Sequence, residues 1–121
     1  MAKNMEISLL LDFYGDMLTE KQRSVIEYYY NDDLSLSEIA DNEGITRQGV
    51  RDSIKRAEVQ LLDMEERLGL ARRFREVRTG LEEIIAAAEQ ITEYNEHFIY
   101  SHELKSNSEK ILEIAKGLCE E

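Results

Sequence analysis

Apolar residues between Val50 and Ile91 recur at alternating spacings of four and three, interrupted at Gly69, and this rhythm constrains the fold more than any other feature. Such spacing places apolar side chains on one face of an α-helix, whereas a half-buried strand requires alternation with a period of two. The chain of 121 residues contains no proline, the residue that most strongly breaks helices. We therefore predict an all-α protein.

Two capping boxes divide the N-terminal part of the chain into helices. Thr19 and Gln22 form the first box, and Ser35 and Glu38 form the second. In each box a hydroxyl side chain and a longer polar side chain three residues later satisfy free backbone N–H groups at a helix start. The boxes predict helices that begin after Thr19 and after Ser35. Apolar spacing predicts an earlier helix over residues 6–15, and Thr46 is expected to cap a fourth helix.

The third and fourth predicted helices have the residue pattern of a helix-turn-helix. A small residue, Ala40, stands where two helices would cross closely, and Gly44 suits the left-handed backbone of a tight turn. Ile45 would then fill the space beneath the turn. Val50 and Ile54, four residues apart, would point inward from the fourth helix.

The other side of the fourth helix is polar and largely cationic. Its candidate nucleic-acid contacts are Thr46, Arg47, Gln48, Arg51, Lys55 and Arg56. Arginine can bridge guanine and glutamine can bridge adenine, so we expect Arg47, Gln48 and Arg51 at base edges, near the helix end that enters a major groove. Lys55 and Arg56 would more naturally contact phosphates. If the ligand is RNA, the same cations would follow its backbone.

Three segments of the chain resemble region 4 of bacterial sigma factors, most closely the compact sigma factors of the extracytoplasmic-function type. They are Leu18–Glu27, Leu36–Ala40 and Gly44–Ala57. The resemblance covers about a third of the chain and implies a helix-turn-helix domain of the sigma region 4 type. The remainder is not sigma-like and contains no counterpart of region 2, so we do not expect a stand-alone sigma factor.

From Glu6–Thr19 onward, nearly the whole chain resembles the YlxM family of small helix-turn-helix proteins of Gram-positive bacteria. This resemblance implies a regulatory role in the signal recognition particle pathway, with the RNA of the particle and its GTPase as expected partners. The residues themselves predict a nucleic-acid-binding scaffold. A protein-interaction adaptor without nucleic-acid contact and a DNA-binding transcription regulator stay open as alternatives.

The chain is expected to divide into a helix-turn-helix domain, residues 1–69, and a helical extension, residues 70–121. The apolar rhythm of the extension predicts either the seam of a homodimer, which we favour, or the core of an internal helical hairpin. The residues of this candidate oligomerisation seam are Leu70, Phe74, Val77, Leu81, Ile84, Ala88 and Ile91. Residues 94–106 are polar and poorly periodic, which predicts a loop or a frayed turn, and a last helix is expected over residues 108–118.

Charge is distributed unevenly along a chain whose net charge is −11. Residues 1–44 and residues 80–121 each carry a net charge of −7, whereas residues 45–79 carry +3. The overall charge argues against non-specific attachment to nucleic acid, while the central excess favours local contact with phosphates. An arginine cluster in this segment predicts either an extension of that contact surface or a solvated helix face with salt bridges. Its members are Arg72, Arg73, Arg75 and Arg78.

The sequence lacks the parts of an enzyme. His97 and His102 are five residues apart rather than the four of a helical zinc pair, and no glycine-rich phosphate loop or nucleophile motif is present. We therefore expect no catalysis, no metal and no cofactor. The single cysteine, Cys119, and the lack of an apolar run long enough for a bilayer predict a cytoplasmic protein without a membrane partner.

Overall fold

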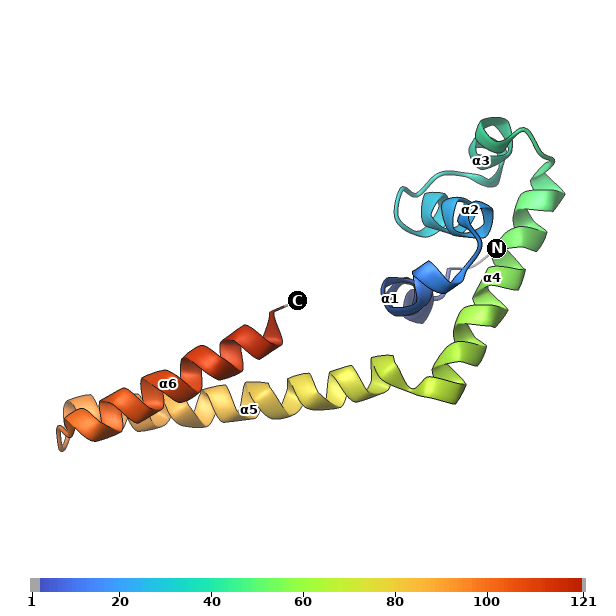
Figure 1. The fold of residues 1–121 in the computed structure, drawn as a ribbon. Helices are drawn as coiled ribbons and strands as arrows, with labels where there is room; N and C mark the ends of the chain where they lie inside the picture. Colours follow the sequence, from blue (N-terminus) through green and yellow to red (C-terminus); the bar gives the residue numbers. More distant parts are fainter. Residues whose placement is uncertain (1–2, 121) are drawn as a thin grey trace. The chain divides into compact units, whose positions relative to one another are not determined.

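The computed structural model describes residues 3–120, which are mostly helical and contain no strand (Figure 1). The helices are α1 (Met5–Tyr14), α2 (Glu20–Tyr30), α3 (Leu36–Glu43), α4 (Arg47–Leu68), α5 (Leu70–His97) and α6 (His102–Cys119). One 3₁₀ turn, Gly15–Met17, follows α1. The predicted all-α fold is confirmed. The chain forms two compact units, the first ending at Arg72 and the second beginning at Arg73.

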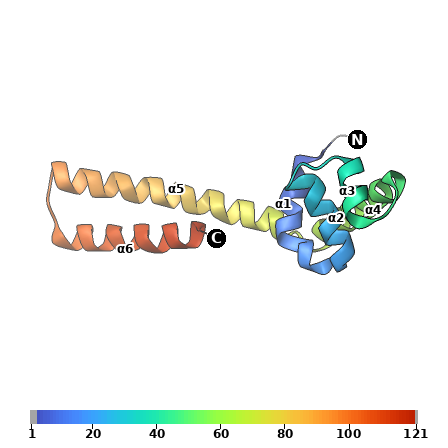
Figure 2. The same cartoon turned by 90° about the horizontal axis from the view of Figure 1, so that it is seen from above.

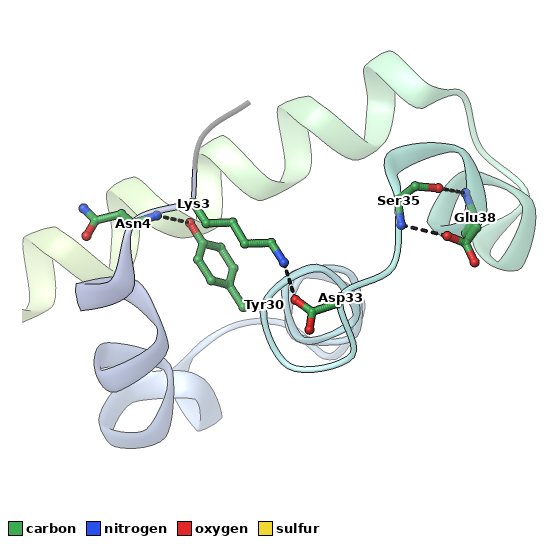
Figure 3. A network of polar contacts seen from close by, with 6 residues as sticks. All are labelled: Lys3, Asn4, Tyr30, Asp33, Ser35 and Glu38. Carbon is green, nitrogen blue, oxygen red and sulfur yellow. Dashed lines mark hydrogen bonds and ion pairs between the residues drawn. The ribbon is translucent and has the colours of Figure 1, made fainter.

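Side-chain caps begin α2 and α3 at the residues that the sequence predicts. The Thr19 hydroxyl accepts the Gln22 N–H at 3.2 Å, and the Gln22 side chain accepts the Thr19 N–H at 3.2 Å. Ser35 and Glu38 form the same reciprocal pair at 3.1 Å (Figure 3). Gly44 then ends α3 with a φ of 66°, the left-handed conformation that favours glycine. These contacts set the geometry of the helix-turn-helix.

In the first unit, α1, α2 and α3 pack against α4, as both views of the ribbon show (Figure 1, Figure 2). Ile39 of α3 is fully buried together with Val50 and Ile54 of α4, so the two helices of the helix-turn-helix share one core. Val25 and Ile26 of α2 are buried in the same cluster. Burying each of these side chains contributes about 1.5–3 kcal/mol, so the core strongly resists rotation of α4 about its axis.

Tyr29 and Tyr30, at the end of α2, lie in this core with their rings edge to face and their centroids 5.3 Å apart. The Tyr30 hydroxyl accepts the Asn4 N–H at 3.3 Å (Figure 3). It also donates to the Glu58 carboxylate on α4. Burial, followed by the hydrogen bond to Glu58, raises the pKa of Tyr30 to about 12. Both tyrosines therefore belong to the core of the first unit.

A carboxylate of α4 caps the start of α5. The predicted break at Gly69 is confirmed, since this residue ends α4 with a φ of 63°. Glu65 accepts the backbone N–H groups of Ala71 and Arg72 at 3.1 and 3.0 Å, which otherwise have no partner within a helix. Ala71 is fully buried in the first core, so the first turn of α5 packs with the first unit although the sequence pattern assigned it to the extension.

In the second unit, α6 runs antiparallel beside α5 as a helical hairpin (Figure 1, Figure 2). The Thr92 hydroxyl of α5 donates to the Ser108 hydroxyl of α6 at 2.8 Å. Near the tip, the side chain of Asn95, only 1% exposed, donates to the Ser101 carbonyl at 2.9 Å and accepts the Ser101 N–H at 2.8 Å. Polar residues therefore line the inside of this hairpin near its tip.

The loop predicted over residues 94–106 is wrong. α5 continues to His97 and α6 begins at His102, so that only residues 98–101 connect the two helices. The apolar rhythm fails there because a polar side chain, Asn95, occupies a position that faces inward. Its hydrogen bonds with Ser101 satisfy the buried amide, and the Ser101 hydroxyl accepts the Leu104 N–H at 3.2 Å as a helix cap.

Candidate nucleic-acid interface

The candidate interface begins at the N-terminal end of α4. The Thr46 hydroxyl caps this helix by accepting the Gly49 N–H at 2.9 Å. Val50 and Ile54, one turn apart, are fully buried. Because two buried residues determine the rotation of a helix, the polar residues on the opposite side are held outward. The core thus presents the predicted contact residues on a rigid element.

The predicted cations of α4 are accessible. Arg47, Gln48, Lys55 and Arg56 are exposed, and Arg51 is half-buried. Within residues 3–120, none of these four cations has a carboxylate within 4.0 Å, since the ion pairs of this segment involve other residues. Exposed and unpaired guanidinium and ammonium groups are suited to charge-assisted hydrogen bonds with phosphate oxygens.

One acidic residue lies among the predicted contacts. Gln48 donates from Nε2 to Asp52 Oδ1 at 3.0 Å, one turn along α4. Asp52 is exposed. A base recognised by the Gln48 amide has to replace this hydrogen bond, and the Asp52 charge repels a nearby phosphate. Asp52 therefore weakens a nucleic-acid contact on this face.

A shallow hollow of about 350 Å³ lies between the start of α3 and the first turns of α4, with Leu36, Arg47, Gln48 and Arg51 around it. It brings together all three residues that the sequence predicts at base edges. Leu36, from α3, adds an apolar side chain beside their polar groups. The arrangement can provide hydrogen-bond donors and apolar contact to one ligand group, as base edges require.

A second hollow, of about 360 Å³, borders the same helix and joins α2 to α4. It is lined by Thr19, Lys21, Gln22, Ile45, Gly49, Ser53 and Arg56. Lys21, which was not among the predicted contacts, here lines the same surface as Arg56. Its place in the first turn of α2 is visible in the sequence, but only the packing of α2 against α4 brings it to this surface.

The described residues offer neither a metal site nor a membrane span. Among residues 3–120, no three His, Cys, Asp or Glu side chains come close enough together to hold a metal ion. No helix in this part of the chain is long and apolar enough to cross a membrane. The cationic face of α4 is the candidate site that these residues present.

Comparison with known proteins identifies the family. Residues 1–111 match the UPF0122 family, described as "Putative helix-turn-helix protein, YlxM / p13 like". The chain belongs to the UPF0122 family. The resemblance seen in the sequence is thereby confirmed at the level of the family. Its helix-turn-helix agrees with α3 and α4 as the structure describes them.

Curated UPF0122 proteins resemble this chain over most of its length. A UPF0122 protein of Acetivibrio thermocellus is 40% identical over 117 residues, which are 97% of this chain and 100% of the relative. One from Desulforamulus reducens is 50% identical over 80 residues, 66% of this chain and 68% of the relative. One from Thermoanaerobacter sp. strain X514 is 48% identical over 87 residues, 72% of this chain and 74% of the relative.

In this UPF0122 chain, the candidate oligomerisation residues occupy two environments. Those buried or half-buried in the structure are Phe74, Leu81 and Ala88. Those that are 44–49% exposed are Leu70, Val77, Ile84 and Ile91. The single seam expected from the sequence is therefore divided between an inner and an outer side of the extension.

The arginine cluster at the start of α5 lies mostly in the second unit of the UPF0122 chain. Arg73 is 3.8 Å from Glu76 and Arg78 is 3.6 Å from Glu82, each within one turn of α5. All four arginines of the cluster are exposed. These ion pairs favour a solvated helix face over an extension of the α4 surface.

Proposed function

We propose that this UPF0122 protein is a non-catalytic regulator that binds nucleic acid through the outward face of α4. The observation that carries the proposal is the unpaired state of Arg47, Arg51, Lys55 and Arg56 within residues 3–120, on a helix whose other side is locked in the core. A net charge of −11 does not prevent this binding, because phosphate contact depends on local cations.

The contacts follow from the two hollows beside α4. Arg47, Gln48 and Arg51 around the first hollow contact base edges, which provide sequence information. Lys55 and Arg56, joined by Lys21 at the second hollow, contact phosphates and set the position of α4 on its ligand. Thr46 keeps the first turn of α4 in place through its cap.

The finer proposal is that the ligand is the RNA of the signal recognition particle and that the GTPase of the particle is a protein partner in the cytoplasm. The resemblance to the YlxM family supports it. Helix-turn-helix proteins commonly place their recognition helix in the major groove of DNA, whereas the major groove of an RNA helix is too narrow for side chains. An RNA ligand is therefore contacted through its phosphates and unpaired bases.

Charge reversal on α4 with a matched control tests the proposal. The test variant carries Arg47→Glu and Lys55→Glu, and the control carries Lys110→Glu and Lys116→Glu at two exposed positions of α6. Both variants have the same net charge, so general repulsion affects them equally. Any difference in binding between them reports local contact with the ligand.

Binding is measured by fluorescence anisotropy with a labelled DNA duplex and a labelled RNA hairpin over a series of salt concentrations. We expect the α4 variant to bind about tenfold or more weakly, with a salt slope shallower by about one for each lost phosphate contact. The control should bind within about twofold of the wild type, as expected for residues outside the contact surface. Equal binding by wild type and α4 variant would overturn the proposal.

A second candidate function is a protein-interaction adaptor, which is favoured by Asp52 among the cations of α4 and by the net charge of −11. If neither nucleic acid binds to the wild type, this function takes the place of the first.

For the extension, we propose that two copies associate through the second unit, in keeping with the apolar seam. The exposure of Val77, Ile84 and Ile91 supports it. Sedimentation of the full chain tests this association, and a monomer at all concentrations would contradict it.

A further inference from the structure

The α5–α6 hairpin carries two rows of exposed apolar residues, each with a spacing of seven along its helix. The row on α5 is Val77, Ile84, Ile91 and, just beyond its end, Phe98. The row on α6 is Leu104, Ile111 and Leu118. Their exposure ranges from 43 to 72%, and neither row contains a charged residue. Only three of these seven residues belong to the seam predicted from the sequence.

Both rows lie on the same side of the hairpin. Each row residue stands three positions after a residue that faces the other helix of the hairpin. Ile91, for example, comes three residues after the buried Ala88, and Ile111 comes three residues after the buried Ser108. In an antiparallel helix pair, residues that stand the same number of positions after the residues facing the other helix lie on the same side of the pair. The residues directly after the inward-facing ones lie on the opposite side of the hairpin. They are exposed and mostly charged, as Glu89 and Glu109 are. The hairpin is therefore amphipathic as a whole.

The apolar face is symmetric about its own centre. Because Thr92 of α5 bonds to Ser108 of α6, the antiparallel helices place Ile111 close to the level of the midpoint between Ile84 and Ile91. That midpoint is the centre of the α5 row, and Ile111 is the centre of the α6 row. A face whose two rows share one centre can match the same face of a second copy, as an isologous interface requires.

Charges at the two ends of the hairpin favour a second copy in the opposite direction. The base of α5, residues 73–80, has a net charge of +2, with Arg73, Arg75 and Arg78 against Glu76. The tip, residues 93–105, has a net charge of −2, with Glu93, Glu96 and Glu103 against Lys105. Opposite directions bring the cationic base of one copy beside the acidic tip of the other, whereas equal directions bring the two acidic tips together.

We propose that a second copy covers this apolar face with its own, running in the opposite direction, so that two hairpins form a four-helix bundle about a two-fold axis near Ile111. The inference rests on the proposed association of two copies and names its face and direction. Across the axis, Ile84 meets Ile91 of the other copy, and Ile111 meets its own counterpart. Such packing buries apolar side chains in the manner of other four-helix bundles.

A disulfide tests the direction. In a chain carrying Cys119→Ser, Ile111→Cys should form a covalent dimer on mild oxidation, seen on a non-reducing gel, because the two thiols lie beside the two-fold axis. The control, Glu109→Cys on the charged side, should stay monomeric on the gel. Hairpins in the same direction would place Ile111 against α5 of the other copy. A dimer in sedimentation without an Ile111→Cys disulfide would therefore overturn the proposed direction.

Charge insertion tests the face. Ile84→Glu with Ile111→Glu should convert the dimer to a monomer in sedimentation, while circular dichroism shows retained helix. The control, Ala86→Glu with Ser106→Glu, adds the same two charges at exposed positions away from the face and should stay dimeric. A wild-type monomer would overturn the association itself. A dimer that persists in the Ile84→Glu, Ile111→Glu variant would keep the association and overturn the face.

Discussion

The hydroxyl of Tyr14, at the end of α1, donates a hydrogen bond of 2.7 Å to Oε1 of Glu65 on α4. The same hydroxyl accepts the Leu70 N–H at 3.1 Å. Because Glu65 also accepts the N–H groups of Ala71 and Arg72, one pair of side chains joins α1, the last turns of α4 and the first turn of α5. The stability of the first unit should therefore depend on this pair.

Substituting Glu65 by Gln should change how stability depends on pH. Burial alone would raise the pKa of Glu65, but hydrogen bonds from Tyr14, Ala71 and Arg72 outweigh it and hold the pKa below its ordinary value of 4.5. A carboxylate whose pKa is lower in the folded chain stabilises the fold at pH values above its pKa in the unfolded chain. This contribution is lost as pH falls through its pKa in the folded chain. Urea unfolding below pH 4.5 should show a steeper loss in the wild type than in Glu65→Gln. The exposed neighbour, as Glu66→Gln, should follow the wild type.

Tyr14→Phe should lower the free energy of unfolding by about 1–3 kcal/mol, because it removes a hydroxyl that both donates and accepts in a buried place while keeping the ring. The measurement is equilibrium unfolding in urea. Tyr94→Phe, at a residue that is 58% exposed, is the matched control and should change stability by about 0.5 kcal/mol at most. Equal stability of the two variants would contradict the role of Tyr14.

The pKa of Tyr30 should lie well above the ordinary tyrosine value of 10.0. Its pKa is raised to about 12 by burial and by the hydrogen bond to Glu58, so the unfolded chain loses this proton first. The resulting stabilisation is fully present at pH values below the ordinary tyrosine pKa of 10.0. It disappears as pH rises through the raised pKa of about 12. Ultraviolet absorbance of tyrosinate should show a late component that Tyr30→Phe diminishes, with the remainder belonging to Tyr14, whose pKa burial also raises. A late component of unchanged amplitude in Tyr30→Phe would contradict the raised pKa of Tyr30.

The same substitution at two glycines should have opposite effects. Gly44 has a φ of 66°, and Gly80 lies in the middle of α5, while an added Cβ would meet nothing within 4 Å at either place. Gly44→Ala should destabilise the chain by about 1 kcal/mol because of its backbone conformation. Gly80→Ala should stabilise it by about 0.5–1 kcal/mol because alanine favours helix. Thermal unfolding measures both, and shifts of the same sign would contradict the conformational explanation.

Asp52→Asn should strengthen nucleic-acid binding if α4 is the contact surface. The change removes a negative charge from among the cations and weakens the hydrogen bond that holds Gln48. We expect an affinity increase of about threefold to tenfold at low salt, corresponding to about 0.7–1.4 kcal/mol. Glu113→Gln, which removes one charge at an exposed position of α6, serves as the control. Identical affinities for the two variants would place the ligand elsewhere.

Local signals predicted the helix-turn-helix well, because its helix starts and turns depend on neighbouring residues. The Ser35 cap, the Gly44 turn and the Thr46 cap each act within a few residues, and each occurs in the structure where the sequence places it. The inward pair Val50 and Ile54 follows directly from helical spacing. These signals also determined the outward residues of α4.

The extension was harder to predict, because its inner and outer sides are both partly apolar. A heptad pattern shows that Ile84 and Ala88 lie near one face, but not that Ala88 packs inward while Ile84 stays exposed. Likewise, the first turn of α5 joins the first unit through Glu65, a contact that spacing cannot reveal. Lys21 lines the surface of α4 only because α2 and α4 pack together.

The buried Asn95 restricts how the length of this hairpin can change. Its amide is satisfied only when Ser101 lies opposite, so sliding one helix along the other by a heptad would leave a desolvated polar group unpaired. An insertion in α5 on the base side of Asn95 lengthens the helix away from the tip and keeps this pairing, whereas an insertion between Asn95 and Ser101 separates the two partners. Homologous hairpins of different lengths should therefore differ at the base and keep the number of residues between these two positions.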